Sequence, residues 1–214
     1  MPITSRIPLW LKVAYTSFVA VLVVVYWRHY GPTNFLYFCD VALLITAVGI
    51  WLESPLLIST AAVGIFGSQT LWVVDFLLQF VGFKLSGMTD YMFDSQQPLY
   101  LRGLSLFHGW LPFLLVYLVW RLGYDRRGLI VWTVIAWGLI LICYFVMPPP
   151  SPNHGLQPVN INYVYGFGED KPQTWMPAAI WLSLEMILLP LVLYFPVHLL
   201  LRRYCSVGTD LRVN

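Results

Sequence analysis

Long apolar runs separated by short polar segments are the main pattern of this chain. A helix rises about 1.5 Å per residue and the bilayer core is about 30 Å thick, so about 20 mostly apolar residues make one span. Six runs come close to this length or exceed it, at residues 9–27, 35–52, 55–83, 99–122, 129–146 and 174–201. The pattern therefore predicts an all-α fold, a polytopic transmembrane helical bundle of six spans, within a single integral membrane domain over residues 1–214.

Two of these apolar runs allow a different interpretation. Residues 55–83 are more than one crossing requires, so this run tilts, kinks or divides into two helices, which would give seven spans. The first run resembles a signal peptide in its position. It is long for one, however, and it ends in Trp27-Arg28-His29-Tyr30 rather than in small residues. We expect it to remain as the first span.

The distribution of Lys and Arg predicts the orientation, because cytoplasmic loops carry an excess of these residues. With six spans, eight basic residues fall on the side of the termini and four on the other side. The eight are Arg6, Lys12, Arg121, Arg126, Arg127, Arg202, Arg203 and Arg212, and the four are Arg28, Lys84, Arg102 and Lys171. We expect a multi-pass protein of the cell membrane with both termini cytoplasmic and the two longest loops outside.

Composition supports the membrane class and excludes several others. Hydrophobic residues make up 59% of the chain and charged residues 10%, against about 25% charged in soluble domains. The few basic residues form no nucleic-acid-binding patch. The three cysteines, Cys39, Cys143 and Cys205, lie far apart without a CxxC pair, which argues against a zinc site and a disulfide framework. We expect no metal, no cofactor and no nucleic-acid partner.

Few ionisable side chains occur inside the apolar runs, and each costs about 2.5–3.5 kcal/mol on insertion scales, which makes it a candidate site residue. They are Asp40, Asp75, His108 and Glu185, with Cys39 beside the first and Gln69 as a neutral companion. In the six-span topology Glu185 lies near the midplane. The others, together with Asn162 and Tyr163 of the last long loop, gather in the outer half of the bundle.

A Cys and a His in one pocket form a nucleophile and base pair, in which the thiolate attacks an acyl carbonyl. Cys39 and His108 fit these roles, and Asp40 or Asp75 could orient the imidazole. Simpler readings remain open. A membrane Cys is usually a packing residue, an intramembrane His can bridge helices, and Asp75 can be solvated near the interface. Cys143 and Cys205 have no polar neighbours in the sequence and are interpreted as structural.

Five segments in order resemble one family. They are Leu36-Tyr37-Phe38-Cys39, Gly67-Ser68-Gln69-Thr70 followed by Asp75, Phe107-His108-Gly109, Asn162-Tyr163-Val164-Tyr165 with Lys171-Pro172, and Leu193-Tyr194-Phe195-Pro196. Residues 35–203 thereby resemble the bacterial YwaF-type integral membrane proteins. Those look related to an animal Cys/His transacylase that builds polyunsaturated ether phospholipids. The resemblance implies a helical bundle, and the animal relative implies Cys39 as acyl carrier with His108 as its base. The chain departs from the family at Asp40, where His or Asn is usual.

Two hypotheses follow. In the first, the chain is an acyltransferase or acyl hydrolase whose partners are membrane lipids, with Cys39 and His108 about 4–6 Å apart. The supporting or substrate-binding residues are then Asp40, Gln69, Asp75, Asn162, Tyr163 and Glu185. In the second, the chain is a non-enzymatic small-molecule binder, transporter or assembly partner, with Cys39 packed in apolar surroundings.

Overall fold

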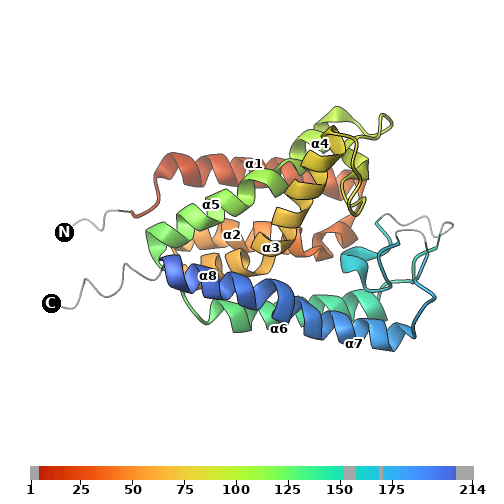
Figure 1. Ribbon diagram of the computed structural model, residues 1–214. Helices are drawn as coiled ribbons and strands as arrows, with labels where there is room; N and C mark the ends of the chain where they lie inside the picture. Colours follow the sequence, from red (N-terminus) through yellow and green to blue (C-terminus); the bar gives the residue numbers. More distant parts are fainter. Residues whose placement is uncertain (1–4, 152–157, 169–170, 206–214) are drawn as a thin grey trace.

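The protein is described by a computed structural model over residues 5–151, 158–168 and 171–205. All the regular structure in these residues is helical, so the expected all-α bundle is confirmed. The main helices are α1 (Leu9–His29), α2 (Phe38–Leu52), α3 (Pro55–Phe80), α4 (Leu99–Ser105), α5 (Phe107–Leu122), α6 (Gly128–Phe145), α7 (Ala178–Leu188) and α8 (Phe195–Cys205) (Figure 1). The short elements are the 3-10 turns η1 (Pro32–Leu36), η2 (Asp90–Met92) and η3 (Ile161–Tyr163), and the π-helix η4 (Leu189–Tyr194).

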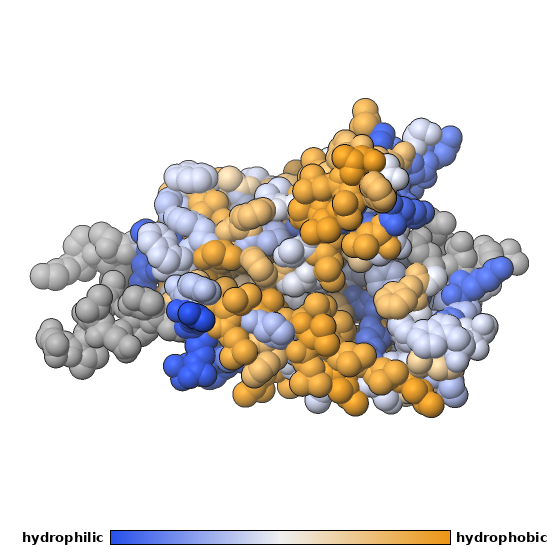
Figure 2. All heavy atoms as spheres, viewed as in Figure 1, coloured by the Kyte–Doolittle hydropathy of each residue, from blue (hydrophilic) through white to orange (hydrophobic). Residues whose placement is uncertain are grey.

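Five helical stretches are long and apolar enough to cross a membrane. They are α1, α3, α4 with α5, α6, and α7 through α8, while α2 is a shorter apolar helix. Their outward surfaces are apolar, and Figure 2 shows orange side chains over the middle of the visible face with blue ones mainly toward its ends. Such a band between polar ends is the surface expected of a protein embedded in lipid.

Several boundaries differ from the apolar runs. The second run opens with η1 and an extended Tyr37, and α2 begins only at Phe38. The third run forms one continuous helix, so the division that seven spans would need is absent from Pro55–Phe80. The fourth run breaks at Leu106 and not at Pro112, which lies inside α5. The last run becomes helical at Ala178 rather than at residue 174.

Helix α3 is the centre of the bundle and packs against α2, α5, α6 and the η4–α8 stretch. Figure 1 shows it crossing between the other helices. Small residues make this close packing possible. A Cβ atom built on Gly64 would lie 2.0 Å from the ring of Trp132 on α6, and one on Gly49 of α2 would lie 2.8 Å from Ile58.

The turn between α2 and α3 is tied to the start of the chain. The Glu53 carboxylate accepts hydrogen bonds from the Ser5 hydroxyl, from the backbone N–H groups of Arg6 (3.0 Å) and Ile7 (3.2 Å), and from Lys12 Nζ (2.8 Å). Partial burial alone would raise the pKa of Glu53, but these hydrogen bonds outweigh it and lower the pKa to about 2. The first described residues are therefore fixed to one end of the bundle.

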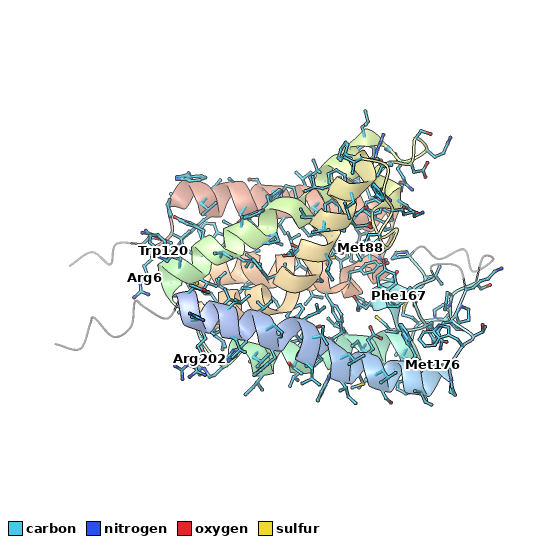
Figure 3. All side chains as sticks on the ribbon, in the orientation of Figure 1. Arg6, Met88, Trp120, Phe167, Met176 and Arg202 are labelled. Atoms are coloured by element: carbon cyan, nitrogen blue, oxygen red, sulfur yellow. The ribbon has the colours of Figure 1, made fainter. Side chains whose placement is uncertain are left out.

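Both described ends of the chain lie at the same end of the bundle, and the two long loops lie at the opposite end (Figure 1). Figure 3 labels Arg6, Trp120 and Arg202 at the first end, and Met88 and Phe167 at the loop end. We call these the terminal end and the loop end. Arg212, which entered the orientation count, lies outside the described residues.

Candidate functional site

Cys39 lies in the first turn of α2, half-buried, at the loop end of the bundle. The backbone N–H groups of Cys39 and Asp40 lie close to its sulfur. Asn162 fixes this helix start from a distant loop, because its Oδ1 accepts the N–H of Phe38 (3.1 Å) and its Nδ2 donates to the carbonyl of Leu36 (2.9 Å). The neighbouring Asp40 carboxyl disfavours a thiolate at this position, so a nucleophilic Cys39 needs a base that takes its proton.

Asp40 is buried next to Cys39 and has one satisfied oxygen. Its Oδ2 accepts a hydrogen bond from Asn34 Nδ2 (2.9 Å), whereas its Oδ1 has no partner among the described residues. The carboxyl also acts electrostatically on Tyr26 of α1 and on Tyr30, which directly follows α1. A buried polar atom without a partner is costly and indicates that another polar group belongs there.

His108 is held in one orientation at the start of α5. The helical break at Leu106 leaves the carbonyl of Ser105 within 2.7 Å of His108 Nδ1. A carbonyl can only accept, so in the neutral ring Nδ1 carries the proton and Nε2 keeps its lone pair. The ring also stacks on Trp72 of α3, with 5.0 Å between centroids. This is the tautomer and the restraint that a general base requires.

A set of aromatic and hydroxyl-bearing side chains connects the surroundings of Cys39 with those of His108. Trp72 Nε1 donates to Tyr91 Oη (3.2 Å), and the Ser105 side chain interacts with Tyr91 and with Tyr26 Oη (2.9 Å). Burial raises the pKa of Tyr91, and the nearby Cys39 side chain acts in the same direction. Cys39 and His108 therefore border one cluster, composed of Tyr26, Trp72, Tyr91 and Ser105, which we call the tyrosine cluster.

The structure records no direct hydrogen bond between Cys39 and His108, so their expected separation of about 4–6 Å stays a prediction. The members of the tyrosine cluster were not identified in the sequence analysis. Ser105 could have been found, because it precedes His108 by three residues and so lies one helical turn away. Tyr91 lies in a loop whose fold no local pattern predicts.

Gln69 is a polar residue of α3 inside the bundle. Gln69 is 2% exposed, and neither atom of its amide has a partner in the described chain. Its amide is thus available to a bound group.

Asp75 has a different role from the predicted one. It is fully buried rather than solvated, and its oxygens accept from the backbone N–H groups of Leu85, Ser86 and Thr89 and from the Thr89 hydroxyl (2.7 Å). No hydrogen bond joins it to His108. Asp75 therefore organises the loop after α3 and does not orient the imidazole.

Asn162 and Tyr163 shape the second long loop. Both have positive φ angles, 58° and 64°, which are strained for residues other than Gly. The hydrogen bonds of Asn162 to the start of α2 offset its backbone strain. The Tyr163 carbonyl accepts a hydrogen bond from Trp181 Nε1 (3.0 Å). Asn162 thus positions Cys39 indirectly.

Glu185 belongs to a second polar group, on the α6–α7 side of the bundle. It acts electrostatically on Cys143 and Tyr194, and its Oε2 is buried without a hydrogen-bond partner among the described residues. Asn162 Nδ2 lies 3.8 Å from Cys143 Sγ. The interpretation of Cys143 as a cysteine without polar neighbours was wrong, because these neighbours come from distant parts of the chain.

Metal ligation has no support from the described residues, where no three His, Cys, Asp or Glu side chains come together. Comparison of the chain with protein-family models, with curated proteins and with solved structures found no match. The likeness to YwaF-type proteins accordingly stays a prediction, and the function has to be argued from the site.

Proposed function

We propose that the protein is a membrane-embedded acyltransferase or acyl hydrolase that acts on lipid esters, with Cys39 as nucleophile and His108 as base. The observation that supports this best is the common position of the two side chains at the border of the tyrosine cluster. Cys39 lies at a helix N-terminus, and His108 presents Nε2 because its Nδ1 is held by a carbonyl.

The chemistry follows from these groups. His108 Nε2 takes the thiol proton of Cys39, directly or through a hydroxyl of the cluster, and the sulfur attacks the ester carbonyl. The C–O bond breaks, the alcohol leaves with the proton from His108, and a thioester remains. Water or a second alcohol then attacks the thioester while His108 takes its proton. The C–S bond breaks, the free acid or the new ester is released, and the proton on His108 returns to the sulfur of Cys39. The unpaired amide of Gln69 is the candidate donor to the oxyanion of each tetrahedral intermediate.

A lipid substrate agrees with the setting of the site. Large apolar side chains are exposed around the loop end, among them Phe80, Phe83 and Leu99. We infer that α2 counts as the sixth crossing, because the described ends share one end of the bundle. Both termini are then cytoplasmic in the cell membrane, and the Cys39 site faces the outer leaflet.

Labelling of Cys39 tests the proposal. The full chain, in detergent or native membranes, is treated with a thiol-reactive probe carrying an acyl chain, and the modified residue is identified by peptide mass spectrometry. We expect labelling at Cys39 that falls by about 10²–10⁴ in rate in His108→Ala, the usual contribution of a general base. Cys205→Ser is the matched control and keeps the labelling. Equal labelling of Cys39 with and without His108 would contradict the proposal.

The non-enzymatic alternative is favoured by one observation, the unpaired and buried amide of Gln69, which also suits the binding of a small polar molecule. The two proposals differ in their dependence on the thiol. Cys39→Ser abolishes acyl transfer but leaves such binding intact, so a phenotype rescued fully by Cys39→Ser in cells supports the binder.

A further inference from the structure

Basic side chains are concentrated at the terminal end of the bundle. Those described there are Arg6, Lys12, Arg121, Arg126, Arg127, Arg202 and Arg203. Four of them have partners within the protein: Lys12 pairs with Glu53, Arg127 pairs with Asp125, Arg121 donates to the carbonyl of Arg6, and Arg203 lies over the ring of Tyr204. Arg126 and Arg202 are exposed, and neither forms an ion pair with a described residue.

These two arginines converge although they come from different elements. Arg126 lies in the α5–α6 turn and Arg202 in α8. The two segments are joined by a hydrogen bond between Tyr124 Oη, two residues before Arg126, and His198 Nδ1 (2.7 Å), one helical turn before Arg202 on α8. Two like charges near one corner repel each other, and an anion between them would relieve that repulsion.

An open cleft lies at this corner. Its volume is about 440 Å³, and it is lined by Pro55, Leu122, Gly123, Tyr124, Asp125 and Arg126. Gly123 leaves open space beside its backbone, and Asp125 is already paired with Arg127. The size of the cleft and the arginine beside it suit a phosphate group better than a neutral ligand.

The level of the cleft is that of lipid headgroups. Pro55 is the first residue of α3 and Leu122 the last of α5, so the cleft lies where spans end. Exposed Trp120 marks the same end of the bundle (Figure 3). Exposed Trp51, near the end of α2 and beside Lys12, lies there as well, as tryptophans do at membrane interfaces. A soluble anion would gain nothing from these apolar neighbours, whereas a phospholipid would place its chains along them.

We propose that the cleft beside Tyr124 binds the phosphate of an anionic phospholipid, with Arg126 and Arg202 as its cationic ligands. The site lies at the opposite end from Cys39 and does not depend on acyl transfer. It also faces the leaflet that carries anionic lipids when the termini are cytoplasmic.

The test uses the purified full chain in detergent, titrated with phosphatidylglycerol or phosphatidylcholine and measured by native mass spectrometry. The test variant is Arg126→Gln/Arg202→Gln. The control is Arg28→Gln/Lys171→Gln, which removes the same charge from the loop end. Each basic side chain near an anionic lipid contributes roughly fivefold in affinity, so we expect the double variant to bind phosphatidylglycerol about 25-fold more weakly. The control keeps its affinity, and phosphatidylcholine binding is the same in all three.

Three results would overturn the proposal. These are unchanged phosphatidylglycerol affinity in the test variant, an equal loss in the control, and displacement of the lipid by inorganic phosphate at matching concentration. Because both arginines are exposed, the test variant is expected to unfold at the wild-type temperature, and this is measured in the same samples. If it unfolds earlier, the single variants Arg126→Lys and Arg202→Lys, which keep the charge, must bind at near wild-type affinity for the proposal to stand.

Discussion

Gly64 shows how one residue decides the packing of two helices. The indole of Trp132 occupies the space where a Cβ atom of residue 64 would stand, and Trp132 is fully buried. Any side chain at position 64 therefore pushes α3 and α6 apart, in the region where Tyr194 also packs edge-on against Trp132. The contact is dispersion between closely spaced atoms, which falls steeply with separation.

We predict that Gly64→Ala destabilises the protein by about 3 kcal/mol or more, because an added Cβ would stand 2.0 Å from a buried ring. Unfolding in mixed detergent micelles measures this. Gly138→Ala on α6 is the matched control, since nothing lies within 4 Å of a Cβ there. Ala has the higher helix propensity, so Gly138→Ala should not lose stability, and a loss as large as that of Gly64→Ala would show that the clash is not the cause.

Asp75 is a second residue with a local and testable role. Asp75→Asn removes the charge that three N–H groups and a hydroxyl of the loop point at. Hydrogen bonds to charged groups contribute about 1.5–3 kcal/mol each, so we expect a loss of about 3 kcal/mol and faster amide exchange over residues 84–90. Asp94→Asn in the same loop should leave both unchanged. If His108 reactivity changed while loop exchange did not, the assignment of Asp75 to the loop would be wrong.

At the scale of elements, the apolar runs predicted the helices well and their breaks poorly. Helices α1, α3 and α6 lie within a few residues of their runs, because apolar length is a local property of the sequence. The break at Leu106 is not local. The Ser105 carbonyl it frees is used by His108, and the Ser105 hydroxyl is used by Tyr26 of α1. Proline usually interrupts a helix, yet α5 continues through Pro112.

The π-helix η4, which contains Pro190, likewise differs from the continuous helix that the last apolar run predicts. Proline lacks the N–H that would bond the carbonyl of Met186, and Trp137 Nε1 of α6 donates to that carbonyl instead (2.8 Å). The replacement donor comes from another helix, so the sequence of the run cannot reveal it. For the site, the same reason applies to Tyr91. Asn162 was among the candidates, but its hydrogen bonds to Phe38 and Leu36 at the start of α2 form only after folding.

The turn between α2 and α3 leads to a prediction on pH. The Glu53 pKa of about 2 lies below its ordinary value of 4.5, so the carboxylate stabilises the folded state above 4.5, and that contribution is lost as pH falls toward 2. We expect the unfolding temperature in detergent to fall between pH 5 and pH 3, and to fall less in Glu53→Gln. If the unfolding temperature of Glu53→Gln depended on pH as strongly as that of the wild type, a carboxyl other than Glu53 would be responsible.

At the scale of the molecule, the shared position of the two described ends predicts a simple labelling pattern. Single cysteines are introduced as Ser5→Cys, Tyr204→Cys and Gln96→Cys, and intact cells are treated with a membrane-impermeant maleimide. We expect Gln96→Cys to react from outside, and the other two to react only after the membrane is opened. Labelling of Tyr204→Cys but not of Ser5→Cys in intact cells would mean an odd number of crossings.

The central place of α3 has a consequence for how the chain is made. Membrane helices leave the ribosome in order, so α3 enters the bilayer before α5 and α6 exist to cover it. Until then its Ser59, Thr60 and Gln69, all buried in the finished bundle, face lipid or the insertion machinery. A nascent chain that stops after α3 is thus an unfinished product with polar groups in hydrocarbon. It should be retained or degraded, and only synthesis through α6 releases it.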